Sequence, residues 1–185
     1  MYAHAGPAGS ERKGRANPRP FPYPSTLSIP KAPPIPDPRR ILVDADACPV
    51  KDEIYRVAWR VGVSVTIVSN QHLRVPAHPL VSRIVVDDGF DAADDWIADA
   101  ADARSIVVTA DILLADRCLK VGATVLAPTG KPFTTASIGG AIATRAIMAD
   151  LRAGGDQLGG PAPFAKADRS RFLSALDAAL VKLAR

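Results

Sequence analysis

The strongest constraint on the fold of this chain is a short apolar run that ends in two aspartates. Residues 41–49 read Ile-Leu-Val-Asp-Ala-Asp-Ala-Cys-Pro, and a helical pattern follows them. Such a run is typical of a buried parallel strand that delivers acidic side chains to the edge of a sheet. Two neighbouring carboxylates repel each other unless a cation lies between them, and a divalent metal ion is the simplest such partner. The segment therefore predicts a metal-dependent site on an α/β scaffold.

Beyond this segment the chain alternates between strand and helix patterns. Apolar and β-branched runs predict strands at 41–45, 63–69, 83–86, 105–109 and 124–126. Apolar residues at helical spacing predict helices at 49–61, 91–103, 111–121, 135–151 and 168–183. Strands that alternate with helices form parallel sheets covered on both faces. We therefore predict an α/β fold with an open, mostly parallel five-stranded sheet, helices on both faces and further C-terminal helices.

The first part of the chain differs in composition from the rest. Residues 1–40 hold ten of the 17 prolines and carry a net charge of +5, whereas residues 41–185 carry a net charge of −1. Proline fixes φ and removes backbone donors, so a packed core is not expected there. We predict a disordered, basic, proline-rich tail over 1–39 and one domain over 40–185. The tail is either a nucleic-acid-binding arm, a ligand for a proline-recognition module, or a solvated extension.

The apolar pattern and the cysteine content bear on the compartment. No apolar run approaches the length of a membrane helix, and the basic N-terminus lacks the apolar segment of a secretory signal. Two cysteines, Cys48 and Cys118, do not form a disulfide framework or a zinc-ligand spacing. A reduced, cytoplasmic protein with no membrane partner is expected. Cys48 lies beside the aspartates, where it is either a reactive thiol or, as we favour, a small residue that fills a tight turn.

Polar side chains follow most of the expected strands. Ligands bind beyond the carboxyl ends of the strands in an open α/β sheet, so these positions are the candidate site. The residues in question are Asp44 and Asp46 after the first strand, Asn70, Gln71 and Arg74 after the second, Asp87, Asp88, Asp91 and Asp94 after the third, and Thr109 and Asp111 after the fourth. Scattered surface charges would not gather in this way.

Several of these acids have a structural explanation as well. Asp91 and Asp111 stand where each could cap a helix, and Asp94 lies close to a capping-box position. We favour the cap for Asp91 and leave both roles open for Asp94 and Asp111. A single cap, however, does not explain why both Asp44 and Asp46 precede another helix.

The donor atoms indicate which ion such a site would prefer. Carboxylate and amide oxygens favour Mg²⁺ or Mn²⁺ over zinc, and His72 and His78 lack a third nitrogen or sulfur ligand near them in sequence. Ions held by a few carboxylates typically act on phosphates. Arg74 and Lys131 are candidates for contacting a phosphate.

The motifs also resemble those of a known family. They are Asp44-Ala-Asp-Ala-Cys-Pro49, Asn70-Gln-His-Leu-Arg-Val-Pro76, Gly89-Phe-Asp-Ala-Ala-Asp94, Thr109-Ala-Asp111, Leu114-Ala115, Gly122-Ala123 and Gly159-Gly-Pro161. From about residue 40 onward the chain resembles the YaiI/YqxD family of uncharacterised bacterial proteins, which is similar to PIN-like nuclease domains. The resemblance implies a parallel α/β fold that holds Mg²⁺ or Mn²⁺ on acidic side chains and cleaves RNA.

The resemblance assigns roles residue by residue. Asp44, Asp94 and Asp111 would ligate the metal and Asp46 would support them, so that these four form the predicted catalytic set. Apart from the resemblance, the positions of Asn70, Arg74 and Thr109 after strands predict that they contact the substrate or orient ligands. Residues 127–130 offer no counterpart of the usual fourth acid.

Three functions follow from these observations. A metal-dependent ribonuclease is the leading hypothesis. The missing fourth acid favours the alternative of a non-catalytic module that binds RNA or protein. An aspartyl-nucleophile phosphatase is a third hypothesis, because Asp44 and Asp46 form an Asp-x-Asp pair, although Cys48 stands where such enzymes usually carry threonine or valine.

Overall fold

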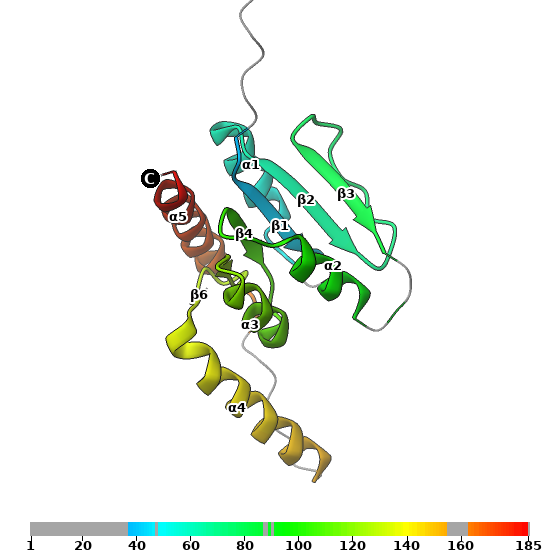
Figure 1. The fold of residues 1–185 in the computed structure, drawn as a ribbon, viewed down its shortest axis with the longest axis vertical. Helices are drawn as coiled ribbons and strands as arrows, with labels where there is room; N and C mark the ends of the chain where they lie inside the picture. Colours follow the sequence, from blue (N-terminus) through cyan, green and yellow to red (C-terminus); the bar gives the residue numbers. More distant parts are fainter. Residues whose placement is uncertain (1–36, 47, 87–88, 90, 155–162, 185) are drawn as a thin grey trace, which may run out of the picture. The chain divides into compact units, whose positions relative to one another are not determined.

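The computed structural model describes residues 37–46, 48–86, 89, 91–154 and 163–184. Its elements, in chain order, are β1 (Arg40–Asp44), α1 (Lys51–Val61), β2 (Ser64–Ser69), β3 (Val81–Val85), α2 (Ala92–Ala100), β4 (Ser105–Val108), α3 (Ile112–Lys120), β5 (Thr124–Leu126), β6 (Pro132–Phe133), α4 (Thr135–Ala153) and α5 (Lys166–Leu183). Figure 1 shows the sheet with helices on both of its faces. The predicted α/β class is therefore confirmed.

The sheet has the strand order β3-β2-β1-β4-β5-β6. β1 lies between β2 and β4, and all pairings among the first five strands are parallel. These are the five strands that the sequence predicts. β6 adds a short antiparallel edge beside β5, which brings the sheet to six strands. Its two residues, one of them a proline, are too few to produce an alternating pattern that a sequence could reveal.

Two apolar cores, one on each face, hold the helices against the sheet. Ile41 and Val43 of β1 pack with α1 and α5, and Leu42 between them packs with α2 and α3. Successive side chains of a strand point to opposite faces, so an uninterrupted apolar run is what a strand covered on both sides requires. This arrangement leaves the carboxyl ends of β1 and β4 as the place where the chain changes from apolar to acidic.

The C-terminal helices occupy separate places. α4 packs against α3, and α5 packs against α1 and β5. α5 contributes Phe172, Leu176 and Leu180 to the core, whereas most side chains of α4 are exposed. Within the described residues no helix combines the length and apolarity that crossing a membrane demands.

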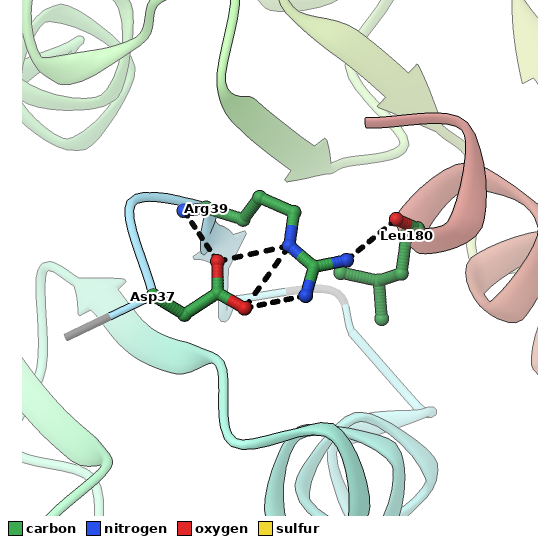
Figure 2. A network of polar contacts seen from close by, with 3 residues as sticks. All are labelled: Asp37, Arg39 and Leu180. Atoms are coloured by element: carbon green, nitrogen blue, oxygen red, sulfur yellow. Dashed lines mark hydrogen bonds and ion pairs between the residues drawn. The ribbon is translucent and has the colours of Figure 1, made fainter. Parts of the chain in front are cut away.

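Residues 37–39 precede the sheet and contact α5. The Arg39 guanidinium donates a hydrogen bond to the Leu180 carbonyl oxygen at 2.6 Å and is paired with the Asp37 carboxylate (Figure 2). The same pairing holds the pKa of Asp37 below its usual range. The remainder of the predicted tail lies outside the described residues, and the boundary at residue 39 stays a prediction.

Candidate functional site

A buried threonine joins the ends of the two central strands. The Thr109 hydroxyl, which follows β4, donates a hydrogen bond to Asp44 Oδ2 at 2.8 Å, at the end of β1. The hydroxyl oxygen of Thr109 also accepts a hydrogen bond from the backbone N–H of Asp111, at 2.9 Å. Thr109 is 1% exposed, so both of its bonds are shielded from water. Thr109 therefore fixes the position of Asp44 relative to the segment that carries Asp111.

Asp111 combines a structural role with an available oxygen. It occupies the N-cap of α3, where its Oδ1 accepts hydrogen bonds from the backbone N–H groups of Leu113 and Leu114 at 2.6 and 3.1 Å. Its Oδ2 faces Arg145 of α4, with 3.7 Å between the oxygen and Nη2. The sequence leaves a capping role for Asp111 undecided, and the structure shows that the cap is present. The cap uses Oδ1 only and leaves Oδ2 without a close partner among the described residues.

Asp94 lies in the first turn of α2, a helix that packs against β1 and β2. Burial is the largest cause that raises the pKa of this carboxyl, to about 6, and the charges of Asp44, Asp111 and Asp91 add to it. Asp91 stands at the N-cap position of α2, but its side chain makes no capping hydrogen bond. Asp91 therefore stands at the helix-cap position that we predicted, but its side chain does not cap the helix.

Asp44 is held in a similar environment. Burial raises its pKa above the usual range, the hydrogen bonds from Thr109 and from the backbone of Asp46 oppose this, and the charges of Asp46 and Asp111 add to the rise. Two carboxyls with raised pKa values, each raised in part by the same neighbour, indicate that Asp44, Asp94 and Asp111 share one electrostatic environment. Proteins concentrate such repulsion mainly where a cation or a reaction uses it.

Asn70 follows β2, the strand next to β1. Its Oδ1 is buried and has no hydrogen-bond partner in the described part of the chain. A buried carbonyl oxygen without a donor is costly, so such an atom points to a group that binds there. Asp46, by contrast, is exposed in the turn after β1. Asp87 and Asp88, which follow β3 in sequence, lie outside the described residues.

The donor set suits a hard divalent ion in part. Its atoms are carboxylate and amide oxygens, which Mg²⁺ and Mn²⁺ prefer, and burial together with neighbouring carboxylates raises the pKa values of Asp44 and Asp94. Within the described ranges, however, no three His, Cys, Asp or Glu side chains converge closely enough to hold an ion. The residues therefore fit a metal in the chemistry of their donor atoms, but the described side chains do not form a converged ligand set.

Two cations that lie near this edge are not among the residues identified from the sequence. Lys51, at the start of α1, donates hydrogen bonds from Nζ to the carbonyl oxygens of Ala45 and Cys48, at 3.1 and 2.9 Å, and so closes the turn that carries Asp46. Arg145 reaches Asp111 from α4, the helix that follows α3 in the chain. The early position of Lys51 in a helix after the acidic turn is a usable signal, whereas nothing local marks Arg145.

Arg74 lies in a groove near the turn that Lys51 closes. The groove is lined by Lys51, Asp52, Tyr55, Arg74, Val75 and Pro76. The Arg74 side chain is exposed, so it is free to meet a ligand. Another groove, which includes Arg39 and Leu180, lies at the amino end of β1, the opposite edge from the acids. The Arg74 groove is therefore the better placed of the two for a substrate of the acidic site.

Cys48 fills the turn, as we favoured from the sequence. It is 4% exposed and belongs to the core beneath α1. Burial raises the pKa of its thiol to about 11, so almost none of it is thiolate at neutral pH. The alternative of a reactive thiol finds no support in this environment.

Comparison with known proteins identifies the relatives of the chain. A family model described as "Uncharacterized BCR, YaiI/YqxD family" matches residues 42–182. The chain belongs to the YaiI/YqxD family. A UPF0178 protein of Sphingopyxis alaskensis is 77% identical over 146 residues, which cover 78% of this chain and 95% of that protein. A UPF0178 protein of Nitrobacter winogradskyi is 60% identical over 146 residues, covering 79% and 93%. No solved structure matches the chain.

Family membership bears on the site only indirectly. The match begins inside β1, so the residues before 42 lie outside it, as the motif resemblance predicts. Asp44, Asp94 and Asp111 all fall within the matched range. The YaiI/YqxD family is itself uncharacterised, so membership names relatives and not a reaction.

The role of Thr109 leads to a prediction about stability. Thr109→Val keeps the shape of the side chain but removes the donor to Asp44 and the acceptor for Asp111 N–H. We expect a loss of about 1–3 kcal/mol in the free energy of unfolding, because buried polar groups are left unpaired. Thr66→Val is the matched control, since its hydroxyl contacts Ser82 at an exposed position. Urea denaturation measures both, and equal losses would refute the proposed coupling.

The raised pKa of Asp94 leads to a second prediction. The pKa of Asp94 is about 6 in the folded protein, which is higher than the pKa of an aspartate in the unfolded chain. Protonated Asp94 therefore favours the folded state below about pH 4, and this contribution to stability is lost as the pH rises through 6. Asp94→Asn should therefore stabilise the metal-free protein at pH 8, by about 1 kcal/mol because the carboxyl is partly exposed. The advantage should vanish at pH 4.

Asp99→Asn is the control for this second prediction, because Asp99 is an exposed acid of the same helix. Denaturation in EDTA at both pH values measures the two variants. A stabilising effect of Asp94→Asn that is the same at pH 4 and pH 8 would show that ionisation of Asp94 is not its cause.

Proposed function

We propose that this protein is a metal-dependent nuclease that acts on RNA. One observation carries the proposal: Asp44, Asp94 and Asp111, from three separate segments, share one electrostatic environment at the carboxyl edge of the sheet. A buried, unpartnered Asn70 Oδ1 beyond the neighbouring strand supports it independently. The resemblance of the motifs to PIN-like domains favours RNA as the substrate.

Each side chain of the site has a separate proposed role. Asp44, Asp94 and Oδ2 of Asp111 would hold Mg²⁺ or Mn²⁺, with Asp46 in support. When bound, such an ion would polarise a phosphodiester and lower the pKa of an attacking water. Thr109 keeps Asp44 in place through its hydrogen bond. Asn70 offers an amide oxygen to the ion or to water, and Arg74 offers a guanidinium to a phosphate of the substrate.

A cleavage assay tests this function. The Mn²⁺-loaded full chain is incubated with single-stranded RNA, and wild type is compared with Asp44→Asn and with Asp99→Asn, an exposed acid away from the site. Loss of cleavage in the first variant alone is the expected result.

A non-catalytic RNA-binding module is the second candidate. It is favoured by the lack of convergence among acidic side chains in the described ranges and by residues 127–130, which supply no carboxylate after β5. This candidate predicts RNA binding in EDTA that survives Asp111→Asn, with no cleavage by the wild type. The aspartyl-phosphatase reading stays a prediction, which a trapped aspartyl-phosphate would support.

A further inference from the structure

A groove between α3 and α4 lies directly beside the acidic site. It is lined by Leu113, Ile142, Arg145, Ala146, Ala149 and Arg152. Its floor is apolar, and its two charged residues are arginines. Arg145 and Arg152 stand two helical turns apart, on the same face of α4. The groove therefore presents two guanidinium groups along a line that begins at Asp111.

The contact between Arg145 and Asp111 is a weak one. The two atoms lie 3.7 Å apart, well beyond the length of a strong charge-assisted hydrogen bond, and the side chains are 48% and 34% exposed. Exposed ion pairs of this kind contribute little, so the guanidinium is easily released. It faces Oδ2, the one oxygen of Asp111 that the helix cap does not use. A cation that binds this oxygen would repel the Arg145 guanidinium and weaken its contact with Asp111.

We propose that Arg145 serves two partners in turn: Asp111 in the metal-free protein, and a phosphate of bound RNA once the acids are neutralised. This inference rests on the proposed function, whose substrate it places along α4. Guanidinium groups bind phosphate in a bidentate manner, and Arg152 extends the positive track away from the site. The apolar floor of Leu113 and Ile142 suits the sugars and bases of a single strand.

The test measures RNA binding by Arg145→Ala in the full chain. The probe is a short, fluorescein-labelled oligouridine with phosphorothioate linkages, followed by fluorescence anisotropy with and without Mn²⁺. Arg60→Ala is the matched control, because Arg60 is also an exposed arginine paired with an aspartate, Asp177, but lies in the groove at the opposite edge. We expect Arg145→Ala to weaken binding by about fivefold or more with Mn²⁺ and by less in EDTA, and to reduce the salt slope by about 0.7.

A double-mutant cycle keeps the inference testable if Arg145→Ala perturbs folding. Asp111→Asn releases Arg145 and should strengthen metal-free RNA binding, and this gain should be lost when Arg145→Lys is added, because lysine cannot form the bidentate contact. Equal RNA binding by Arg145→Ala and Arg60→Ala would overturn the inference, and so would a gain in binding that is independent of Arg145. Either result would favour a protein partner for the groove.

Failure of the proposed function would look different. If Mn²⁺ binding and cleavage are both absent, but metal-free RNA binding still depends on Arg145, the groove is supported and the nuclease is not. If cleavage depends on Asp44 while Arg145→Ala binds RNA as the wild type does, the nuclease is supported and the groove is refuted.

Discussion

Gly130→Ala is expected to lower the free energy of unfolding by about 3 kcal/mol. Gly130 has a φ of +82°, a conformation that costs an L-residue about 1–2 kcal/mol. A Cβ at this position would also lie 2.6 Å from the Arg171 carbonyl carbon and the Phe172 backbone nitrogen. These atoms belong to α5, and Phe172 is fully buried, so the helix cannot shift without disturbing the core.

Gly62→Ala is the control that separates these two costs. Gly62 has a nearly identical φ of +80°, but a Cβ there would meet nothing within 4 Å. Its replacement should therefore cost only about 1 kcal/mol, from the backbone conformation alone. Urea denaturation of both variants measures the difference. Equal losses would mean that the loop around Gly130 yields readily, and that α5 does not fix its position.

Asp44→Asn is expected to abolish RNA cleavage, with a loss of about 100-fold or more. Removing a group that merely supports a metal ligand already costs about 10–100-fold, and Asp44 is a proposed ligand itself. The fold should be retained, because an asparagine oxygen can still accept the hydrogen bond from Thr109. In EDTA at pH 8 the variant should be at least as stable as the wild type, since Asp44 has a raised pKa and its charge is unfavourable there.

Asp99→Asn should cleave RNA at the wild-type rate, because Asp99 is exposed on α2. Circular dichroism and urea denaturation establish that each variant is folded before rates are compared. Unchanged turnover in a folded Asp44→Asn protein would remove Asp44 from the chemistry. A loss that is equal in both variants would point to a general effect of charge.

The sequence predicts the sheet well because its strands are buried on both faces. Runs such as 41–43 and 106–108 are apolar throughout, which distinguishes them from half-exposed strands and places them in the centre of a parallel sheet. β3 is harder to delimit, because it lies at the edge and includes an arginine. β6 is missed, because two residues cannot form a pattern.

The acids of the site are also predictable, and their partners are not. Asp44 is the last residue of β1 and Asp111 comes shortly after β4, and parallel strands end at the same edge, so topology alone brings them together. The Thr109 bond to Asp44 follows from the same registry of β1 and β4. Arg145 reaches Asp111 only because α4 packs against α3, and the packing of one helix on another leaves no local signature in a sequence.

Calorimetry of Mn²⁺ binding to the full chain, with wild type, Asp44→Asn and Asp99→Asn titrated at pH 7, measures whether Asp44 holds a metal ion. Saturable binding by the wild type and by Asp99→Asn, with none by Asp44→Asn, is the expected result. Wild-type binding that persists unchanged in a folded Asp44→Asn protein would contradict the proposed metal site, because the ion would then be held elsewhere than at the carboxyl edge of the sheet.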